Sequence, residues 1–302
     1  MKLPRLSALL PVLAVSVLCL AIPPALAGES SNYADREEVR AFARAMQTEY
    51  GLAEEEVLAA LAQAQRDDQV IRLITPPSRP GVRSWARYRA RFIEPVRIRE
   101  GLAFWDTYQA SLRAASEKYG VPEEIILGIL GVETIYGRNT GDFSLVSALA
   151  TLAFDYPPRA ELFRRELENL FLLAREQGVP VTAYHGSYAG AIGYPQFLPS
   201  SIRNFAVDFD GDGHIDLENS PADAIGSVAH YLQVHGWQPG GPVAVPAQLA
   251  GAAPAELLAA DIHPTFLPDE LARHGVRARR GESYPEKAAL IELVTPDAPS
   301  RE

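Results

Sequence analysis

One acidic residue, Glu133, stands in an apolar segment and could act as a proton donor. The eight residues before it, from position 125 to position 132, are all Ile, Leu, Val or Gly. We therefore expect its carboxyl group to be short of water, which raises the pKa of a carboxylic acid toward neutral pH. The alternative is an acid at the rim of a core helix that points to solvent.

A second segment, residues 186–199, combines small residues with aromatic ones. Glycine and alanine let a backbone come close to a ligand, and aromatic rings offer flat apolar faces on which sugar rings can stack. Ser187 and Gln196 could donate or accept hydrogen bonds and orient such a ligand. The aromatic residues of the segment are Tyr188, Tyr194 and Phe197. The alternative is a glycine-rich turn whose aromatic residues belong to the core.

Residues 208–219 fit the calcium loop of an EF-hand. Carboxylates stand at positions 1, 3, 5 and 9 of the loop, and these are Asp208, Asp210, Asp212 and Asp216. Gly213 occupies the turn position, His214 would contribute its backbone carbonyl, and Asn219 replaces the usual glutamate at position 12. We expect a structural Ca²⁺ site with a Kd near ~10⁻⁴ M, because a charged ligand is missing. A solvated Asp-Gly turn is the alternative.

The first 27 residues have the pattern of a secretory signal peptide. Lys2 and Arg5 precede an apolar run from Leu9 to Leu20, and Ala25–Ala27 forms a small-residue cleavage site. The run is too short to cross a bilayer, which takes about 20 residues. Leu18 stands where a lipid-attachment site at Cys19 would want a small residue. We therefore expect a periplasmic product without a transmembrane segment or lipid anchor.

The mature chain is acidic and contains no cysteine. Removing the leader takes two of the 28 basic side chains and none of the 38 acidic ones, which leaves a net charge of −12 (26 − 38). Such a charge argues against nucleic acid as a partner. Without cysteine there are no disulfides, so stability must come from an ordinary core or from a metal.

Apolar residues at helical spacing predict a mainly α body over residues 28–239. We expect a helix from Trp85 that Pro95 interrupts, one that Pro122 opens and that carries Glu133, and one after Pro158. For Trp85 and Tyr88 we expect core positions. Residues 240–302 predict a smaller mixed or β-containing part, since residues 243–245 and 290–294 are β-compatible.

Many short motifs of the chain, in order, resemble one family, the membrane-bound lytic transglycosylase B type, a lysozyme-like group that acts on peptidoglycan. The match is densest over residues 119–237. The motifs are Gly131-Val-Glu133-Thr with Gly137, Ala148–Leu152, Tyr156-Pro157 with Arg159, Gly186–Phe197, Ala206–Ile215, Ala224–Ala229 and His235–Trp237.

The resemblance implies a monomeric lytic transglycosylase that cleaves the MurNAc–GlcNAc β-1,4 bond and leaves 1,6-anhydro-MurNAc ends. It implies a lysozyme-like α domain, a calcium loop and no organic cofactor. Glu133 would be the sole acid/base, and Ser187 and Gln196 would line the sugar cleft, with Tyr188, Tyr194 and Tyr231 as weaker candidates. For calcium it implies Asp208, Asp210, Asp212, the His214 carbonyl and Asn219, with Asp216 as an outer ligand.

The chain departs from the family at its C-terminal end. Relatives continue past the position of Val294 with a segment rich in Asn, Tyr and Arg, whereas this chain stops at Glu302. We therefore expect a shortened C-terminal part and a cleft that lacks part of one wall. Two alternatives remain open: a calcium-stabilised peptidoglycan-binding protein without catalysis, and a hydrolytic muramidase with Asp142 or Asp155 as second carboxylate.

Overall fold

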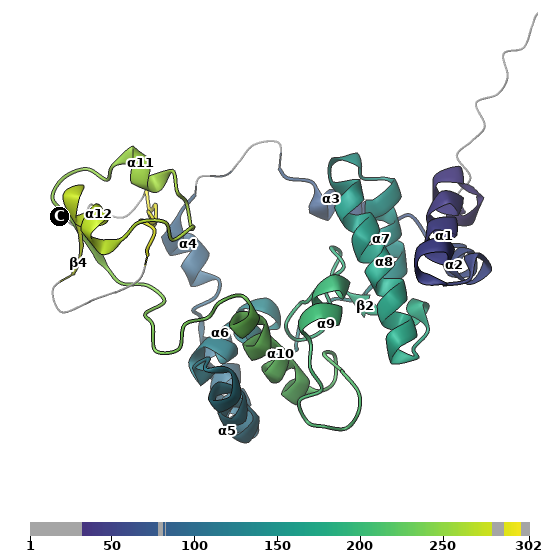
Figure 1. Cartoon of the computed structure of the whole chain (residues 1–302), viewed down its shortest axis with the longest axis horizontal. Helices are drawn as coiled ribbons and strands as arrows, with labels where there is room; N and C mark the ends of the chain where they lie inside the picture. The colour runs from purple at the N-terminus through teal and green to yellow at the C-terminus, as the bar shows by residue number, and fades with distance from the viewer. Residues whose placement is uncertain (1–31, 78–80, 82, 280–286, 297–302) are drawn as a thin grey trace, which may run out of the picture.

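The computed structural model describes residues 32–77, 81, 83–279 and 287–296, so the predicted leader lies outside the described residues. The described part is mainly helical, as predicted (Figure 1). Its α-helices are α1 (Glu37–Tyr50), α2 (Glu54–Leu61), α3 (Asp68–Ile74), α4 (Trp85–Ala90), α5 (Pro95–Tyr119), α6 (Glu123–Thr134), α7 (Leu145–Phe154), α8 (Ala160–Gln177), α9 (Pro199–Phe205), α10 (Pro221–Val234), α11 (Ala255–Leu258) and α12 (Pro268–Arg273). The 3-10 helices are η1 (Tyr33–Asp35), η2 (Pro157–Arg159) and η3 (Val181–Ala183).

The described strands are short and form two antiparallel pairs. Strand β1 (Phe143–Ser144) pairs with β2 (His185–Gly186), and β3 (Ala247–Leu249) pairs with β4 (Val276–Ala278). The C-terminal part therefore contains β-structure, but not where the sequence predicted it. Residues 243–245 and 290–294 form no strand, because β-branched composition alone does not supply a pairing partner.

Local sequence explains where the helices around Glu133 begin. Pro95 does not interrupt a helix but opens α5, and the Glu94 side chain caps it by accepting from two backbone N–H groups. Pro122 lies directly before α6, whose first turn carries two glutamates. Acidic side chains stabilise the positive end of a helix dipole. The prediction of a helix that Pro122 opens and that carries Glu133 is confirmed.

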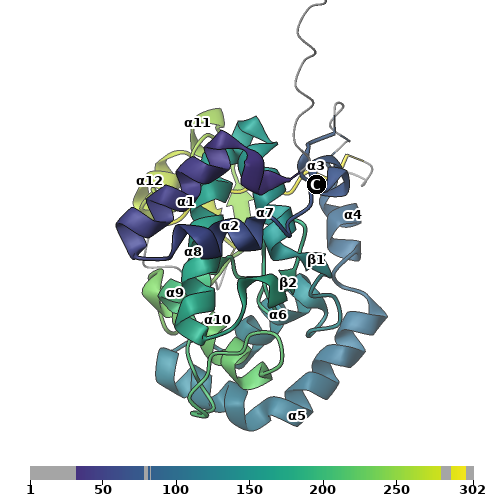
Figure 2. The same cartoon turned by 90° about the vertical axis from the view of Figure 1, so that its right-hand side faces the viewer.

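The largest buried cluster joins the N-terminal helices to α7 and α8. It includes Val39, Met46, Leu61, Leu149 and Leu167, all of them almost inaccessible to solvent. In Figure 2, α1 and α2 lie across the face of α7 and α8. Helices α7 and α8 therefore form the central layer of this part of the molecule.

A second cluster holds α5, α6 and α10 together, and a third lies near the C-terminal end. Leu112, Ile126 and Ile225 represent the three helices of the second cluster, which lie side by side in both views (Figures 1 and 2). Residues of the third cluster are Leu257, Leu271, Val276 and Leu290. Trp85 and Tyr88 of α4 are exposed, which corrects the core positions predicted for them: their rings stack on each other, with centroids 5.8 Å apart, instead of packing into one of these clusters.

Asp155, at the end of α7, fastens the N-terminal segment to the body. Its side chain is 6% exposed, and its carboxylate accepts hydrogen bonds from the Tyr33 hydroxyl and from Arg36 at 2.9 Å. The Tyr33 hydroxyl also lies 3.3 Å from the Thr151 hydroxyl. The pKa of Tyr33 is raised well above its usual value by burial and by these contacts with Asp155.

Asp155→Ala should lower the free energy of unfolding by about 2–4 kcal/mol, because it removes the buried carboxylate that accepts from both the Tyr33 hydroxyl and the Arg36 guanidinium. Denaturant unfolding followed by circular dichroism measures the change. Asp68→Ala is the control, since its exposed ion pair with Arg66 should contribute about 0.5 kcal/mol or less. Equal destabilisation by both variants would contradict this role of Asp155.

Candidate active site and calcium loop

Glu133 lies in the last turn of α6 on the solvent side of the helix. The prediction of a carboxyl group short of water is therefore only partly right. Its side chain is exposed, yet the protein atoms around it still raise the pKa of its carboxyl group by desolvation. The apolar residues before it serve the helix interface with α5 and α10 rather than a pocket around the acid. Glu133 is an accessible acid with an elevated pKa.

The backbone turns sharply just after Glu133. Ile135 (φ 52°), Tyr136 (φ 56°) and Gly137 (φ 85°) are consecutive left-handed residues, and two of them carry side chains that disfavour this region. The Tyr136 ring fills the space beside Gly131 of α6 and Gly101 of α5, where any side chain would collide with it. Packing of this ring between two helices therefore fixes the turn.

The aromatic, glycine-rich loop, residues 186–197, is attached to the chain that follows Glu133 at three points. The Thr134 hydroxyl lies 2.9 Å from the Tyr194 carbonyl oxygen, to which it donates. The Gln196 side-chain amide donates to the Thr140 carbonyl oxygen at 3.0 Å. Strand β1 pairs with β2, which places Gly186 opposite Phe143. The sequence did not indicate these contacts, but they bring the two predicted segments together.

Of the predicted sugar-binding residues, two have side-chain oxygens beside this junction. Ser187 Oγ accepts from the backbone N–H groups of Ala189 and Ala191, so its own proton is available to donate. The Gln196 amide nitrogen is used within the protein, bonding the Thr140 and Gly193 carbonyl oxygens, and its side-chain oxygen is the atom left to face a ligand.

The rings of the three predicted tyrosines all pack against other residues of the protein. Tyr194 fills the space at Gly137 and lies near Phe104 at 6.2 Å between ring centroids. Tyr188 packs on Phe143 at 6.4 Å. Tyr231 is stacked on His235 with the ring centroids 4.0 Å apart, at the end of α10. Tyr194 thus supports the turn after Glu133, while the binding roles of all three remain predictions.

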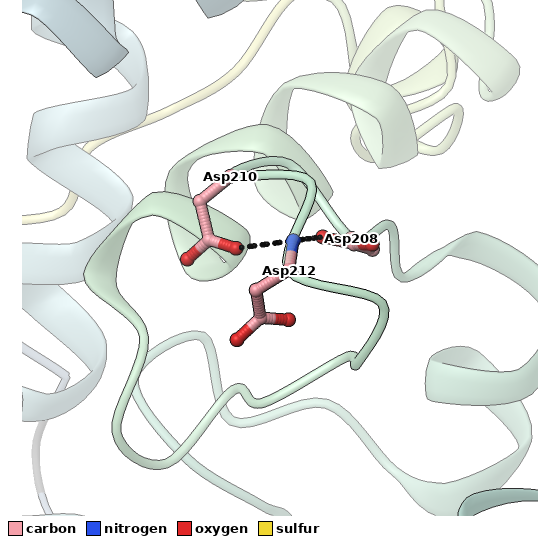
Figure 3. A group of neighbouring side chains, drawn as sticks. All are labelled: Asp208, Asp210 and Asp212. Carbon is pink, nitrogen blue, oxygen red and sulfur yellow. Dashed lines mark hydrogen bonds between the residues drawn. The ribbon is translucent and has the colours of Figure 1, made fainter.

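The calcium loop brings three carboxylates together, as Figure 3 illustrates. Asp208, Asp210 and Asp212 are exposed, and each offers an oxygen within 4.8 Å of the others. Asp208 accepts from the Gly211 and Gly213 N–H groups at 2.7 and 2.9 Å, which curls the loop around it. Oxygen ligands at this density suit a hard cation such as Ca²⁺.

Two of the predicted calcium residues, Asp216 and Asn219, form hydrogen bonds with each other. Asp216 accepts from the Glu218 and Asn219 N–H groups, and the Asn219 amide donates back to Asp216 at 3.0 Å. This pair shapes the exit of the loop, and Asp216 is not part of the carboxylate group. The outer-ligand role of Asp216 and the position-12 role of Asn219 remain predictions. The His214 N–H donates to Asp212 at 2.8 Å, and the role of its carbonyl remains a prediction.

Asp223, in the first turn of α10, closes the loop. Its side chain is buried, and it accepts from the Phe209 N–H at 2.7 Å and from the Asp216 N–H at 2.8 Å. One carboxylate thereby binds the second and the ninth position of the loop. Its own N–H donates to the hydroxyl of Ser220, the N-cap residue of α10. The signal for it was present in the sequence, but it lay beyond the twelve positions of the motif.

The calcium loop and the aromatic, glycine-rich loop are in direct contact. The Tyr194 N–H donates to the Leu217 carbonyl oxygen at 2.8 Å. A cavity of about 300 Å³ opens nearby, lined by residues of α8, residues 179–192 and the calcium loop, including Tyr184, Asp216 and Glu218. Burial and these two carboxylates raise the pKa of Tyr184 to about 12. Glu133 is not among the residues that line this cavity.

Two remaining acids were the candidates for a second catalytic carboxylate. Asp155 is committed to Tyr33 and Arg36, as described above. Asp142 is exposed and immediately precedes β1. Glu133 is therefore the acid whose surroundings both raise its pKa and join it to the predicted sugar loop.

Comparison with known proteins identifies relatives over nearly the whole chain. The family described as "Transglycosylase SLT domain" matches residues 34–302. Membrane-bound lytic murein transglycosylase B of Escherichia coli is 41% identical over 271 residues, which are 87% of this chain and 73% of that protein.

Solved structures share the fold. Catenated lytic transglycosylase SltB1 from Pseudomonas aeruginosa has a TM-score of 0.80 and 42% identity, and the match covers 87% of this chain and 86% of that one. The Escherichia coli lytic transglycosylase Slt35 in complex with calcium has a TM-score of 0.77 and 40% identity, over 87% and 82% of the two chains. The mainly α, lysozyme-like fold with a calcium loop is thereby confirmed.

Glu133→Gln should raise the melting temperature at pH 7. The raised pKa of Glu133 means that its ionised form is disfavoured in the folded protein, so the wild type loses stability as the pH rises through the ordinary glutamate pKa of about 4.3 and above. The amide carries no such penalty, and the two proteins should converge below about pH 4. Thermal melts from pH 3 to pH 8 measure this difference, and a variant less stable at neutral pH would contradict it.

Proposed function

The chain belongs to the family of enzymes with a transglycosylase SLT domain, and from this premise we propose that it cleaves the MurNAc–GlcNAc β-1,4 bond of peptidoglycan. The products would end in 1,6-anhydro-MurNAc, with Glu133 as the sole acid/base. The observation that supports this most directly is the position of Glu133: an accessible acid of raised pKa, in a turn joined to the loop at residues 186–197.

The proposed chemistry needs only one carboxyl group. Protonated Glu133 gives its proton to the glycosidic oxygen as the bond from that oxygen to the anomeric carbon breaks. The 6-hydroxyl of the same sugar then attacks the anomeric carbon and returns its proton to the Glu133 carboxylate. A hydrolase would need a second carboxylate to activate water or to act as nucleophile. Asp155 is bound elsewhere, which favours the single-acid route.

We place the substrate on the loop that is attached to the Glu133 turn. The Ser187 hydroxyl and the Gln196 side-chain oxygen would bond sugar hydroxyl or acetamide groups. Tyr188 and Tyr231 would offer ring faces at the borders of the site. Tyr194 would act mainly by supporting the loop, because its ring fills the space at Gly137.

We further propose that residues 208–219 bind a structural Ca²⁺. Three converging carboxylates support this assignment, and a relative of known structure is described in complex with calcium. Cleavage after Ala27, a periplasmic location without an anchor and a monomeric state also remain proposals. None of the helices in the described part of the chain combines the length and apolar character of a bilayer-spanning segment.

Digestion of purified peptidoglycan by the full-length mature protein tests the catalytic proposal. Mass spectrometry of the muropeptides should show 1,6-anhydro ends for the wild type and for Glu124→Gln, whose exposed carboxylate lies on the same helix. Glu133→Gln should lose at least about 10³-fold in rate, because the proton donor is gone.

Each other result of this digestion rejects a specific part of the proposal. Reducing ends without anhydro sugar would indicate a muramidase. Sedimentation of the protein with peptidoglycan without any product would indicate a binding protein. Wild-type activity in Glu133→Gln would exclude Glu133 as the acid.

Calcium should raise the melting temperature of the wild type. With a Kd near ~10⁻⁴ M, 10 mM Ca²⁺ would stabilise the folded state by about 2.7 kcal/mol. Asp212→Asn should lose most of this gain, whereas Asp106→Asn, exposed on α5, should keep it. Equal amounts of MgCl₂ control for ionic strength. A melting temperature that neither calcium nor chelator changes would contradict the proposed calcium site.

A further inference from the structure

We propose that Thr134 is the positioning residue for Glu133, and that its hydroxyl group fixes the end of α6 against the main chain of Tyr194. The inference rests on the proposed function, because it concerns the placement of that acid. It adds a residue that does not touch the substrate but determines where the reacting carboxyl group lies.

Thr134 is fully buried. Its side-chain hydroxyl and its backbone carbonyl oxygen both have hydrogen-bond partners outside α6. Its hydroxyl donates to the Tyr194 carbonyl oxygen and accepts from the Gly137 N–H, both at 2.9 Å. Its carbonyl oxygen accepts from the Asn139 N–H at 2.9 Å. One side-chain oxygen thus joins the last turn of α6, the left-handed turn that follows it, and a loop 60 residues further along the chain.

These contacts restrain Glu133 because it is the residue immediately before Thr134. The helix ends at Thr134, and Ile135 and Tyr136 take the left-handed conformation, which an isolated chain would avoid. Without the hydroxyl, the Gly137 N–H and the Tyr194 carbonyl lose their partner. The end of α6 is then less firmly held against these two groups, and a displacement of about 1 Å at a catalytic group can cost roughly 10²-fold in rate.

Side-chain packing also holds this region together. Removal of the Thr134 hydroxyl should therefore change the position of Glu133 without preventing the protein from folding. The Tyr136 ring lies beside Gly131 and the Tyr194 ring lies beside Gly137, with no room for larger residues. These rings keep the two segments together when the hydroxyl is removed. Thr134→Val should therefore fold, while the local position of the Glu133 carboxyl group becomes less defined.

The contact extends to the calcium loop through a single residue. Tyr194 accepts from Thr134 through its carbonyl oxygen and donates to Leu217 of the calcium loop through its N–H, at 2.8 Å. A change in the loop can therefore reach Glu133 across two hydrogen bonds. Removal of the Thr134 hydroxyl eliminates the second of these bonds, the one between Tyr194 and Thr134.

The test compares Thr134→Val with Thr134→Ser and with Thr107→Val. Valine keeps the shape of threonine without the hydroxyl, serine keeps the hydroxyl, and Thr107 is an exposed threonine of α5 whose hydroxyl bonds only within its helix. On soluble peptidoglycan oligomers, Thr134→Val should lower kcat by roughly 10- to 100-fold, with KM changed by less than about 3-fold. Thr134→Ser should remain within about 3-fold of the wild type.

The pH dependence supplies a readout that simple destabilisation would not move. A looser turn exposes the Glu133 carboxyl group to more water, so its raised pKa should fall toward the ordinary glutamate value. The descending, alkaline limb of kcat should therefore move to lower pH in Thr134→Val and not in Thr134→Ser. Carbon-13 NMR of the labelled Glu133 carboxyl group measures the same shift without any turnover.

The outcomes separate this inference from the catalytic proposal. If Thr134→Val matches the wild type in kcat and in the pKa of Glu133, or if Thr134→Ser is as impaired as Thr134→Val, the positioning role is wrong. If the wild type itself yields no anhydro products, the proposed function fails, while the NMR comparison still decides whether Thr134 positions Glu133. If Thr134→Val does not fold, the serine variant decides: wild-type kcat and Glu133 pKa support the hydroxyl, and loss of either rejects it.

Discussion

The left-handed turn after Glu133 is the constraint on which the arrangement of the site depends. Left-handed backbone at a residue with a side chain costs about 1–3 kcal/mol and persists only where the surroundings impose it. Here Ile135 and Tyr136 adopt it together, and the burial of the Tyr136 ring between two helices offsets that cost. The turn stops α6 at the acid and sends the chain toward β1, so that the end of a rigid helix presents a carboxyl group to solvent.

The surroundings of Glu133 balance two requirements that oppose each other. A general acid needs a raised pKa, which burial supplies, and it must also reach a polymeric substrate, which requires exposure. The exposed side chain with a pKa raised by nearby protein satisfies both in part. A second ionised carboxylate close by would raise that pKa further, but it would also favour hydrolysis. Asp155, one of the two candidates for a second catalytic carboxylate, instead joins the N-terminal segment to α7.

Local patterns in the sequence predicted the elements of the site but not their contacts. Helix α6 follows from its proline, its two initial glutamates and its apolar run, and the calcium loop follows from the spacing of its aspartates, because these signals act over a few residues. The bond between Thr134 and Tyr194 joins positions 60 residues apart, and no periodicity encodes such a pairing. For the same reason the exposure of Glu133 and the actual strand positions did not follow from composition.

In the calcium loop, hydrogen bonds determine the backbone conformation, whereas the repulsion among the carboxylates is a separate contribution. Asp223 holds the loop by accepting hydrogen bonds from the N–H groups at its second and ninth positions, and backbone N–H groups turn toward Asp208 and Asp212. The loop conformation is thus specified by hydrogen bonds of the protein itself. These bonds do not offset the repulsion among the three carboxylates, whose oxygens lie within 4.8 Å of one another in a chain of net negative charge. A cation would remove that repulsion without reshaping the loop, so its effect on the distant Glu133 would come through the rigidity of Leu217 and Tyr194 rather than through a change of fold.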